Sequence, residues 1–167
     1  MARRRVHLGL GSNLGARWSH LAAAIEELTG LDGGLALSSI YETAPVGGPA
    51  QGPYLNAVVA FDSAAPHREL LALAQRLERA AGRVRLERWG PRTLDVDVLL
   101  VEGETSADPE IELPHPRLYE RAFVLAPLEE ISPSLAPAGW REALGGEGAV
   151  AAEVRRVGTI VPKAARR

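Results

Sequence analysis

Two aspartates, Asp95 and Asp97, stand inside the apolar run TLDVDVLLV, directly after a segment rich in arginine. The run is typical of a strand, so the two side chains point to the same side, with Cα atoms about 6.5 to 7 Å apart. Carboxylates at this spacing can converge on one Mg²⁺ ion, or on two ions about 3.5 to 4 Å apart, and the metal offsets their mutual repulsion. The pattern indicates metal-assisted chemistry on phosphates.

The arginines before the two aspartates favour the same chemistry. Between residues 76 and 92 there are only two glutamates but six arginines, at positions 76, 79, 83, 85, 88 and 92. Planar guanidinium groups bind phosphate oxygens through paired hydrogen bonds, so we expect Arg83, Arg85, Arg88 and Arg92 to face a metal-bound polyphosphate. One alternative stays open: the aspartates could lie on the solvated face of an edge strand, paired with these arginines.

Further polar and aromatic residues suit a bound ligand. His115 lies between two prolines and near Arg121, so it is either structural or a hydrogen-bond donor to a phosphate. Tyr54 and Asn56 share one face of the run YLNAVVAFDS, and an amide that donates and accepts suits a flat heterocycle. Trp89 is either an anchor in a small local core or part of a closing lid.

The glycine-rich segment GLGSNLG follows a predicted strand and precedes a predicted helix, which is the context of a dinucleotide-binding or phosphate-binding loop. Its spacing argues against both. Leu14 stands where the third glycine of a dinucleotide motif belongs, and no lysine follows. We expect a tight turn in which Ser12 and Asn13 bond the local backbone.

The elements that must position these residues follow the order strand, helix, strand, strand, helix, strand. Period-two patterns predict strands over RVHLGLG, LALSSIYET, YLNAVVAFDS and TLDVDVLLV, and spacings of three and four predict helices up to Gly30 and Gly82. This is the order of an α+β, ferredoxin-like fold with a split βαβ core and an antiparallel sheet with helices packed on one face. RAFVLAPLEEI predicts a C-terminal helical extension. We expect one domain over residues 1–167, with residues 146–167 as a partly mobile tail.

Composition excludes several classes of protein. With no cysteine, disulfides and thiolate metal sites are impossible, and a net charge of −2 lacks the basic field of nonspecific nucleic-acid binding. The apolar run near the start is too short and too broken by glycine for a signal peptide or a membrane span. We expect a cytoplasmic protein without nucleic-acid or membrane partners, and a monomer, because no long apolar stripe is left over.

The segment RWGPRTLDVDVLL resembles the signature of the 6-hydroxymethyl-7,8-dihydropterin pyrophosphokinases, enzymes of folate biosynthesis. Four further segments agree with that family in order: GLGSNLG, SSIYETAPVGGPAQGPYLNAV, QRLERAAGRVR and LPHPRLYERAFVLAPL. The resemblance covers roughly residues 5 to 136. It implies transfer of diphosphate from ATP to the hydroxymethyl oxygen of the reduced pterin, with AMP as product and two Mg²⁺ ions bridging enzyme and nucleotide.

The resemblance also implies roles for individual residues. Metal ligands are Asp95 and Asp97, and the further catalytic residues are Arg83 and Arg92. The nucleotide side comprises Gln75, Glu78, Arg85, Arg88, Trp89, His115 and Arg121. The pterin ring lies between Tyr54 and Phe123, and its edge is bound by Thr43, Ala44, Val46 and Asn56. Residues 44–53 and 83–92 are expected to close as lids that exclude water.

Two other hypotheses stay open on the sequence. A ferredoxin-like nucleic-acid binding module would need exposed aromatic residues beside basic ones on its central strands, and YLNAVVAF lacks the usual signature of such strands. A different metal enzyme with two aspartates could act on nucleotides with another acceptor, and consumption of the pterin distinguishes it.

Overall fold

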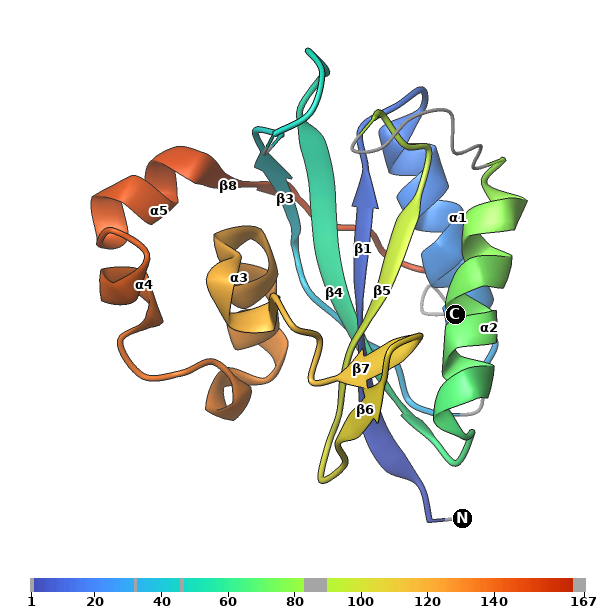
Figure 1. Cartoon of the computed structure of the whole chain (residues 1–167). Coiled ribbons are helices and arrows are strands. Elements are labelled where there is room, and N and C mark those ends of the chain that lie inside the picture. The colour runs from blue at the N-terminus through green and yellow to red at the C-terminus, as the bar shows by residue number, and fades with distance from the viewer. Residues whose placement is uncertain (1, 32, 46, 83–89, 164–167) are drawn as a thin grey trace.

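The computed structural model describes residues 2–31, 33–45, 47–82 and 90–163. The strands of its main sheet are β1 (Arg4–Ser12), β2 (Ala36–Leu37), β3 (Ile40–Thr43), β4 (Tyr54–Ser63), β5 (Asp95–Val101) and β8 (Val154–Gly158). Their order is β5-β1-β4-β3-β8, with β2 also paired to β4, and every pair is antiparallel. Because β4 lies between β1 and β3, this is the predicted split βαβ arrangement (Figure 1).

Helices cover both faces of the sheet. Their bounds are α1 (Arg17–Thr29), α2 (His67–Ala80), α3 (Ala122–Ile131), α4 (Trp140–Ala143) and α5 (Glu147–Glu153). In Figure 1, α1 and α2 lie on one side of the sheet, and α3, α4 and α5 lie on the other. The expectation of helices on one face was therefore incomplete. β4 and β5 carry buried apolar residues toward the second face too, among them Val58 and Leu99, and these need a cover.

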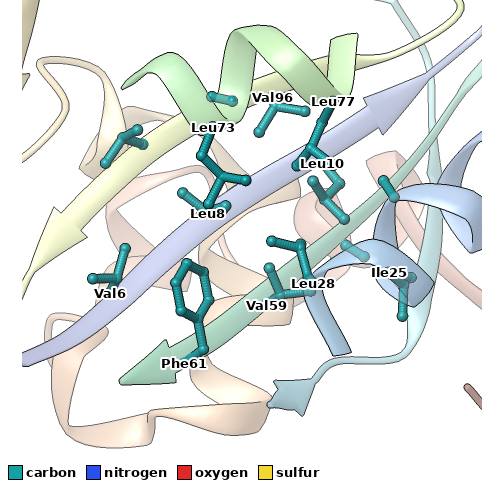
Figure 2. Packing of buried hydrophobic residues seen from close by; sticks show 14 of the residues in the cluster. Val6, Leu8, Leu10, Ile25, Leu28, Val59, Phe61, Leu73, Leu77 and Val96 are labelled. Atoms are coloured by element: carbon teal, nitrogen blue, oxygen red, sulfur yellow. The ribbon is translucent and has the colours of Figure 1, made fainter. Parts of the chain in front are cut away.

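The main core lies between the sheet and the first two helices. Val6, Leu8 and Leu10 of β1 alternate with His7 and Gly9, as the period-two pattern predicts, and all three are buried. Figure 2 shows them packed with side chains of α1, α2 and β4. Burying one such side chain fully stabilises the fold by about 1.5 to 3 kcal/mol. This core holds β1 in the interior of the sheet, between β5 and β4.

A second core holds the C-terminal helices against the other face. Leu125 and Leu128 of α3 belong to one buried cluster with Val58 of β4 and Leu99 of β5. Trp140, at the start of α4, joins the same cluster. The predicted helix RAFVLAPLEEI is confirmed, and its packing brings the start of α3 over the middle of the sheet.

The predicted strand LALSSIYET is interrupted at Ser38 and Ser39, which separate β2 from β3. The Ser38 hydroxyl accepts a hydrogen bond from the Val58 backbone N–H at 2.9 Å. The Ser39 backbone N–H donates to the carboxylate of Glu130 on α3, at 3.0 Å to Oε2. Serine side chains and a helix carboxylate replace ladder partners here, which the alternation of apolar residues does not reveal.

The predicted tail contains regular structure. Residues 147–153 form α5, and β8 adds a strand beside β3 at the edge of the sheet. Glu42 of β3 forms ion pairs with Arg155 of β8 at 2.7 Å and with Arg17 of α1 at 3.2 Å. The mobility of residues 146–167 stays a prediction. Among the described residues, no helix is both long and apolar enough to cross a membrane.

The remaining elements are short. A hairpin of β6 (Ser106–Asp108) and β7 (Ile111–Leu113) follows β5, and single 3₁₀ turns occupy Leu118–Glu120 and Pro133–Leu135. The first of these turns leads directly into α3. The chain thus passes from the hairpin to the face of the sheet that carries the two aspartates.

Candidate active site

Strand register places the two aspartates opposite two glycines. Asp95 and Asp97 of β5 pair with Gly11 and Gly9 of β1. On the other side of β1, Gly11 lies opposite Asn56 of β4. Directly opposite residues of antiparallel strands project to the same face. The carboxylates and the Asn56 amide therefore project from one face of the sheet, on either side of a strand that carries no side chains there.

Gly11 is a position where a side chain has little room. A Cβ atom built on it would lie 3.1 Å from Asn56 Oδ1 and 3.5 Å from Tyr54 Cδ1. At Gly9 the nearest atom to such a Cβ is Cδ2 of Leu99, at 3.4 Å, which is ordinary van der Waals contact. A glycine inside a strand commonly marks such a close approach of another group. Here the two glycines form the floor of a hollow.

A cavity of about 210 Å³ occupies this hollow. Its walls come from the sheet, from the chain between β3 and β4, and from the start of α3 with the residues just before it. The predicted site residues that line it are Thr43, Ala44, Tyr54, Asn56, Arg92, Asp95, Asp97, Arg121 and Phe123. Residues that the sequence did not single out as site residues also line it, among them Gly9, Gly11, Gln51, Arg117, Glu120 and Glu153.

One end of the cavity combines carboxylates with guanidinium groups. Arg92 Nη1 lies 2.8 Å from Asp95 Oδ2, and Arg121 Nη1 lies 3.9 Å from Asp97 Oδ2. Removal from water and, after it, the neighbouring Asp95 carboxylate raise the pKa of Asp97, and the charge of Arg121 acts in the opposite direction. The aspartates thus share one site as like charges. β5 is an edge strand and Asp95 is paired with Arg92, as the alternative of a solvated face has it, but both aspartates also line the cavity.

This end fits a divalent cation of the magnesium type. Two carboxylates on one strand face provide hard oxygen ligands, and a cation between them would offset the repulsion that raises the pKa of Asp97. In the part of the chain that the structure describes, no group of three or more His, Asp or Glu side chains could surround a metal ion. The remaining ligands would therefore be substrate phosphates and water, as is usual for Mg²⁺.

The other end of the cavity is aromatic and amide-lined. Tyr54 begins β4, and Phe123 lies in the first turn of α3. The Asn56 amide donates a hydrogen bond from Nδ2 to Thr43 Oγ1 at 2.7 Å, so its orientation is held from the neighbouring strand. The guanidinium carbon of Arg121 lies 5.5 Å from the centroid of the Phe123 ring. This end offers ring faces and an oriented amide to a flat ligand.

Three described residues of the predicted nucleotide side do not line the cavity. Gln75 is exposed on α2, whereas Glu78 is buried and accepts a hydrogen bond from the Val96 backbone N–H at 2.9 Å. His115 donates from its backbone N–H to Leu99 O at 2.7 Å, and its charge is among those that lower the pKa of Asp97. Their binding roles stay predictions.

Five predicted site residues lie outside the described residues. They are Val46, Arg83, Arg85, Arg88 and Trp89. Most of the segment 83–92, which was predicted to close as a lid, also lies outside the described residues. Of the predicted residues at the carboxylate end, the structure describes Arg92, Asp95, Asp97 and Arg121.

The glycine-rich segment has a different place from the one expected. Residues up to Ser12 belong to β1, and Asn13 bonds distant residues instead of the local backbone. Its Nδ2 donates to Gln51 Oε1 at 2.8 Å, and its Oδ1 accepts from the Arg92 backbone N–H at 2.8 Å. The expected local bonding of Asn13 was wrong. Two glycines at alternate positions inside a strand were the available signal that this segment forms the floor of a site.

Comparison with known proteins connects this geometry to a family. The family model of 7,8-dihydro-6-hydroxymethylpterin-pyrophosphokinase (HPPK) matches residues 7–133. A protein of Methylorubrum extorquens named 2-amino-4-hydroxy-6-hydroxymethyldihydropteridine pyrophosphokinase is 46% identical over 144 residues, which are 84% of this chain and 91% of the relative. Proteins of the same name occur in Bacillus subtilis, with 45% identity over 127 residues, and in Porphyromonas gingivalis, with 43% over 137 residues.

These alignments extend over most of this chain and most of each relative. The Bacillus subtilis alignment covers 75% of this chain and 76% of the relative, and the Porphyromonas gingivalis alignment covers 79% and 93%. The matched residues 7–133 include β1 with its two glycines, the loop before β4, β5 with its two aspartates, and α3. The sequence resemblance is thereby confirmed, and the protein belongs to the 7,8-dihydro-6-hydroxymethylpterin pyrophosphokinase family.

Proposed function

We propose that this protein transfers diphosphate from ATP to the hydroxymethyl group of 6-hydroxymethyl-7,8-dihydropterin, giving AMP and the pterin diphosphate, as a step of folate biosynthesis. Family membership supports the reaction. The observation that carries the proposal is the strand register, which sets Asp95 and Asp97 across two glycines from Asn56 in one cavity. The substrate class follows from the two ends of that cavity, one charged and one aromatic.

The transfer joins the pterin oxygen to the β-phosphorus of ATP and breaks the bond between that phosphorus and the oxygen bridging to the α-phosphate. The proton of the hydroxyl passes to solvent, and AMP leaves with the bridging oxygen. The protein's task in such a reaction is alignment of the two oxygens and stabilisation of spreading negative charge. Arg92 and Arg121 serve that purpose from the walls of the cavity.

Asp95 and Asp97 would hold two Mg²⁺ ions together with the phosphates. When bound, such ions neutralise phosphate charge and fix the diphosphate between the attacking and leaving oxygens. The chain's own contribution is to hold the two carboxylates on one face of β5, with Arg92 paired to Asp95 at 2.8 Å. This pairing limits the directions in which the Asp95 carboxylate can turn.

The reduced pterin would occupy the aromatic end. Tyr54 and Phe123 would contact its ring faces, and the Asn56 amide, held by Thr43, would bind its edge. Ala44 lines the same end of the cavity. A ring in that position would have room to direct its hydroxymethyl group toward the carboxylates, because the cavity floor between the two ends is bare backbone.

We further propose that the protein acts as a monomer in the cytoplasm, where ATP is abundant, and that its partners are the two small substrates. In this proposal three further residues contribute to nucleotide binding. They are Gln75 and Glu78 of α2, and His115, which bonds the backbone of Leu99 in β5. The net charge of −2 favours neither nucleic acid nor an acidic membrane surface as a partner.

The decisive experiment measures AMP formation from ATP and Mg²⁺ with and without the reduced hydroxymethyl pterin. The proteins compared are the wild type, Asp97→Asn, and the control Asp62→Asn, which alters a surface aspartate paired with Arg5 at 3.2 Å. We expect pterin-dependent AMP in the wild type and the control, and a loss of about a hundredfold or more in Asp97→Asn. Pterin-independent AMP, or ADP as product, would point to another acceptor or another transfer and would contradict the proposal.

A further inference from the structure

Glu153 differs from the other carboxylates of the cavity wall in having no charged partner among the residues that the structure describes. It is exposed, and it lines the cavity. Each of the other described carboxylates there has an arginine beside it: Arg92 lies 2.8 Å from Asp95, Arg121 lies 3.9 Å from Asp97, and Arg117 lies 3.5 Å from Glu120. Within the described chain, the Glu153 carboxylate also accepts no hydrogen bond. A negative charge at the rim of the cavity is thus left for a ligand.

The strand register places Glu153 at the aromatic end of the cavity. It is the last residue of α5, and the next residue, Val154, begins β8. Figure 1 shows α5 leading into β8 beside β3. Val154 pairs with Thr43 and the two strands are antiparallel, so Glu153 lies on the side of Thr43 from which the chain continues to Ala44. Thr43 and Ala44 also line the cavity, so all three residues border the same part of it.

Glu153 and the two aspartates of β5 stand at opposite edges of the sheet, because β5 and β8 are the first and last strands of the observed order. Neighbouring strands lie about 4.8 Å apart, so the two edges are about 19 Å from each other. Between the edges the face presents the bare backbone of Gly9 and Gly11, then Asn56 of β4, then Thr43 of β3. A phosphate group followed in line by a flat bicyclic ring fits this order of surfaces.

Stability of the fold does not explain a carboxylate at this position. The C-terminal end of a helix carries partial negative charge, which disfavours an acidic side chain there. The nearby Arg155 does not compensate it, because Arg155 pairs with Glu42 at 2.7 Å. Glu153 also lies outside residues 7–133, which the family model matches. Its role is therefore to be derived from the cavity that it borders.

The reduced pterin carries at one end the groups that a carboxylate binds. Its pyrimidinone ring has an amino group at C2 and an N–H at N3, which are neighbouring donors that point the same way. An ionised carboxylate is an acceptor only, and its two oxygens can accept two parallel hydrogen bonds. The hydroxymethyl group at C6 lies at the other end of the bicyclic ring. A pterin with C6 directed toward the aspartates therefore directs its amino edge toward Glu153.

We propose that Glu153 is a substrate-binding residue whose carboxylate accepts hydrogen bonds from the 2-amino group and N3–H of the pterin, and so selects a 2-amino ring over a 2-oxo ring. The identity of this ligand rests on the proposed function. Asn56 and Thr43 bind the ring from the floor of the cavity, and Glu153 binds it from the rim. In a 2-oxo ring an oxygen would face the carboxylate in place of the amino group, and two acceptors repel each other.

The test compares two rings that differ in the substituent at C2. They are 6-hydroxymethyl-7,8-dihydropterin and 6-hydroxymethyl-7,8-dihydrolumazine, which carries an oxygen where the pterin carries the amino group. Calorimetry under anaerobic conditions gives the dissociation constant of each. We expect the wild type to bind the lumazine at least about tenfold more weakly than the pterin. Equal affinity of the wild type for the two rings overturns the proposal.

The variant Glu153→Gln should move the two affinities in opposite directions. Its amide has the size of the carboxylate, loses the charge and one acceptor, and gains a donor for the 2-oxo group. We expect the affinity for the pterin to fall by about fivefold and the affinity for the lumazine to rise. A role in the fold alone would weaken the binding of both rings. A parallel fall in both affinities, or no change in either, overturns the proposal.

Glu147→Gln is the matched control. Glu147 is the first residue of the same helix, is exposed, and pairs with Arg141 at 3.1 Å on a side of α5 away from this cavity. The substitution removes the same charge from the same helix. We expect wild-type affinity for both rings. The same opposite shifts in Glu147→Gln would assign the effect to the net charge of α5 and would overturn the specific role of Glu153.

Steady-state kinetics separate this inference from the proposed function. In Glu153→Gln the KM for the pterin should rise by about fivefold, whereas the KM for ATP should change by less than about twofold. Pterin-dependent AMP formation with an equal pterin KM in both proteins overturns the role of Glu153 and leaves the proposed function standing. A wild type that binds neither ring and forms no AMP contradicts both.

Discussion

The Glu78 carboxylate of α2 accepts a hydrogen bond from the backbone N–H of Val96, which stands between the two aspartates of β5. Glu78 is 8% exposed, and β5 lies at the edge of the sheet in the observed strand order. The helix behind the sheet thereby provides an acceptor for a backbone N–H of this edge strand. It holds the strand on which Asp95 and Asp97 depend, from the face opposite to the cavity.

Removal of the Glu78 carboxylate should therefore weaken both the fold and the nucleotide site. In Glu78→Ala the Val96 N–H stays buried without this acceptor, which should lower the free energy of unfolding by about 1 to 3 kcal/mol. We expect the KM for ATP to rise at the same time, because the carboxylates lose their support. Urea denaturation and steady-state kinetics measure the two effects. The control Glu69→Ala, in the first turn of the same helix, should leave the KM unchanged.

The floor of the cavity should accept a methyl group at one glycine and not at the other. In Gly11→Ala the new Cβ would lie 3.1 Å from Asn56 Oδ1 and would displace the amide, so pterin affinity should fall by about tenfold. In Gly9→Ala it would lie 3.4 Å from the end of the Leu99 side chain, an ordinary van der Waals contact, and the loss should stay below about threefold. Calorimetric titration with the pterin measures both. Equal losses would mean that close approach to Asn56 is not the reason for glycine at position 11.

Metal dependence should follow the carboxylates of β5. Chelation of divalent cations should abolish AMP formation, and added Mg²⁺ should restore it. In Asp95→Asn one ligand charge is lost, so the Mg²⁺ concentration for half-maximal activity should rise by about tenfold or more. The control is Asp108→Asn, which alters an aspartate of the β6–β7 hairpin that is paired with the exposed Arg68 of α2. This variant should keep the wild-type Mg²⁺ requirement. Full activity in the presence of chelator would contradict the metal role.

His7 should make the stability of the protein depend on pH. Its ring is completely buried, Nε2 lies 2.8 Å from Ser132 Oγ, and burial, followed by the charge of Arg5, lowers the pKa of His7 from 6.5 to about 4. Between these values the unfolded chain binds a proton that the folded chain does not. The free energy of unfolding should therefore fall as the pH decreases from 6.5 to about 4, by up to about 3 kcal/mol.

The contribution of His7 can be isolated with the variant His7→Gln, which does not titrate in this range. Urea denaturation at several pH values between 4 and 7.5 should give a smaller decrease for His7→Gln than for the wild type across the stated window. Above pH 7 the difference between the two proteins should be constant. Parallel curves throughout would mean that His7 titrates alike in the folded and unfolded chain.

Much of the fold was predictable because its signals are local. The alternation in β1 and β4 and the stripes of α1 and α2 gave the split βαβ core, which the structure confirms. The interruption at Ser38 and Ser39 depends on Glu130, far away in the chain, and no local pattern reveals it. The cover on the second face by α3 was missed for a related reason: apolar residues on both faces of β4 and β5 indicate two covered faces only when the strands are considered together.

The site was predictable where residue type decides and not where position decides. The charge and spacing of Asp95, Asp97 and Arg92 indicate phosphate and metal chemistry in the sequence alone, and all three line the cavity. Gly11 has no chemistry of its own, and its meaning comes from the register that sets Asn56 opposite to it. Asn13 was assigned to a local turn because asparagine favours turns, whereas its partners come from segments that meet only in the folded chain.

The pairing of β8 with β3 has a consequence during synthesis. β3 emerges from the ribosome early, and its outer partner, residues 154–158, emerges among the last residues described here. Throughout that interval one edge of the growing sheet presents free backbone donors and acceptors, the arrangement that invites pairing with another chain. Pairing with β8 should therefore remove the open edge of β3, and the ion pair between Glu42 of β3 and Arg155 of β8 stabilises this pairing.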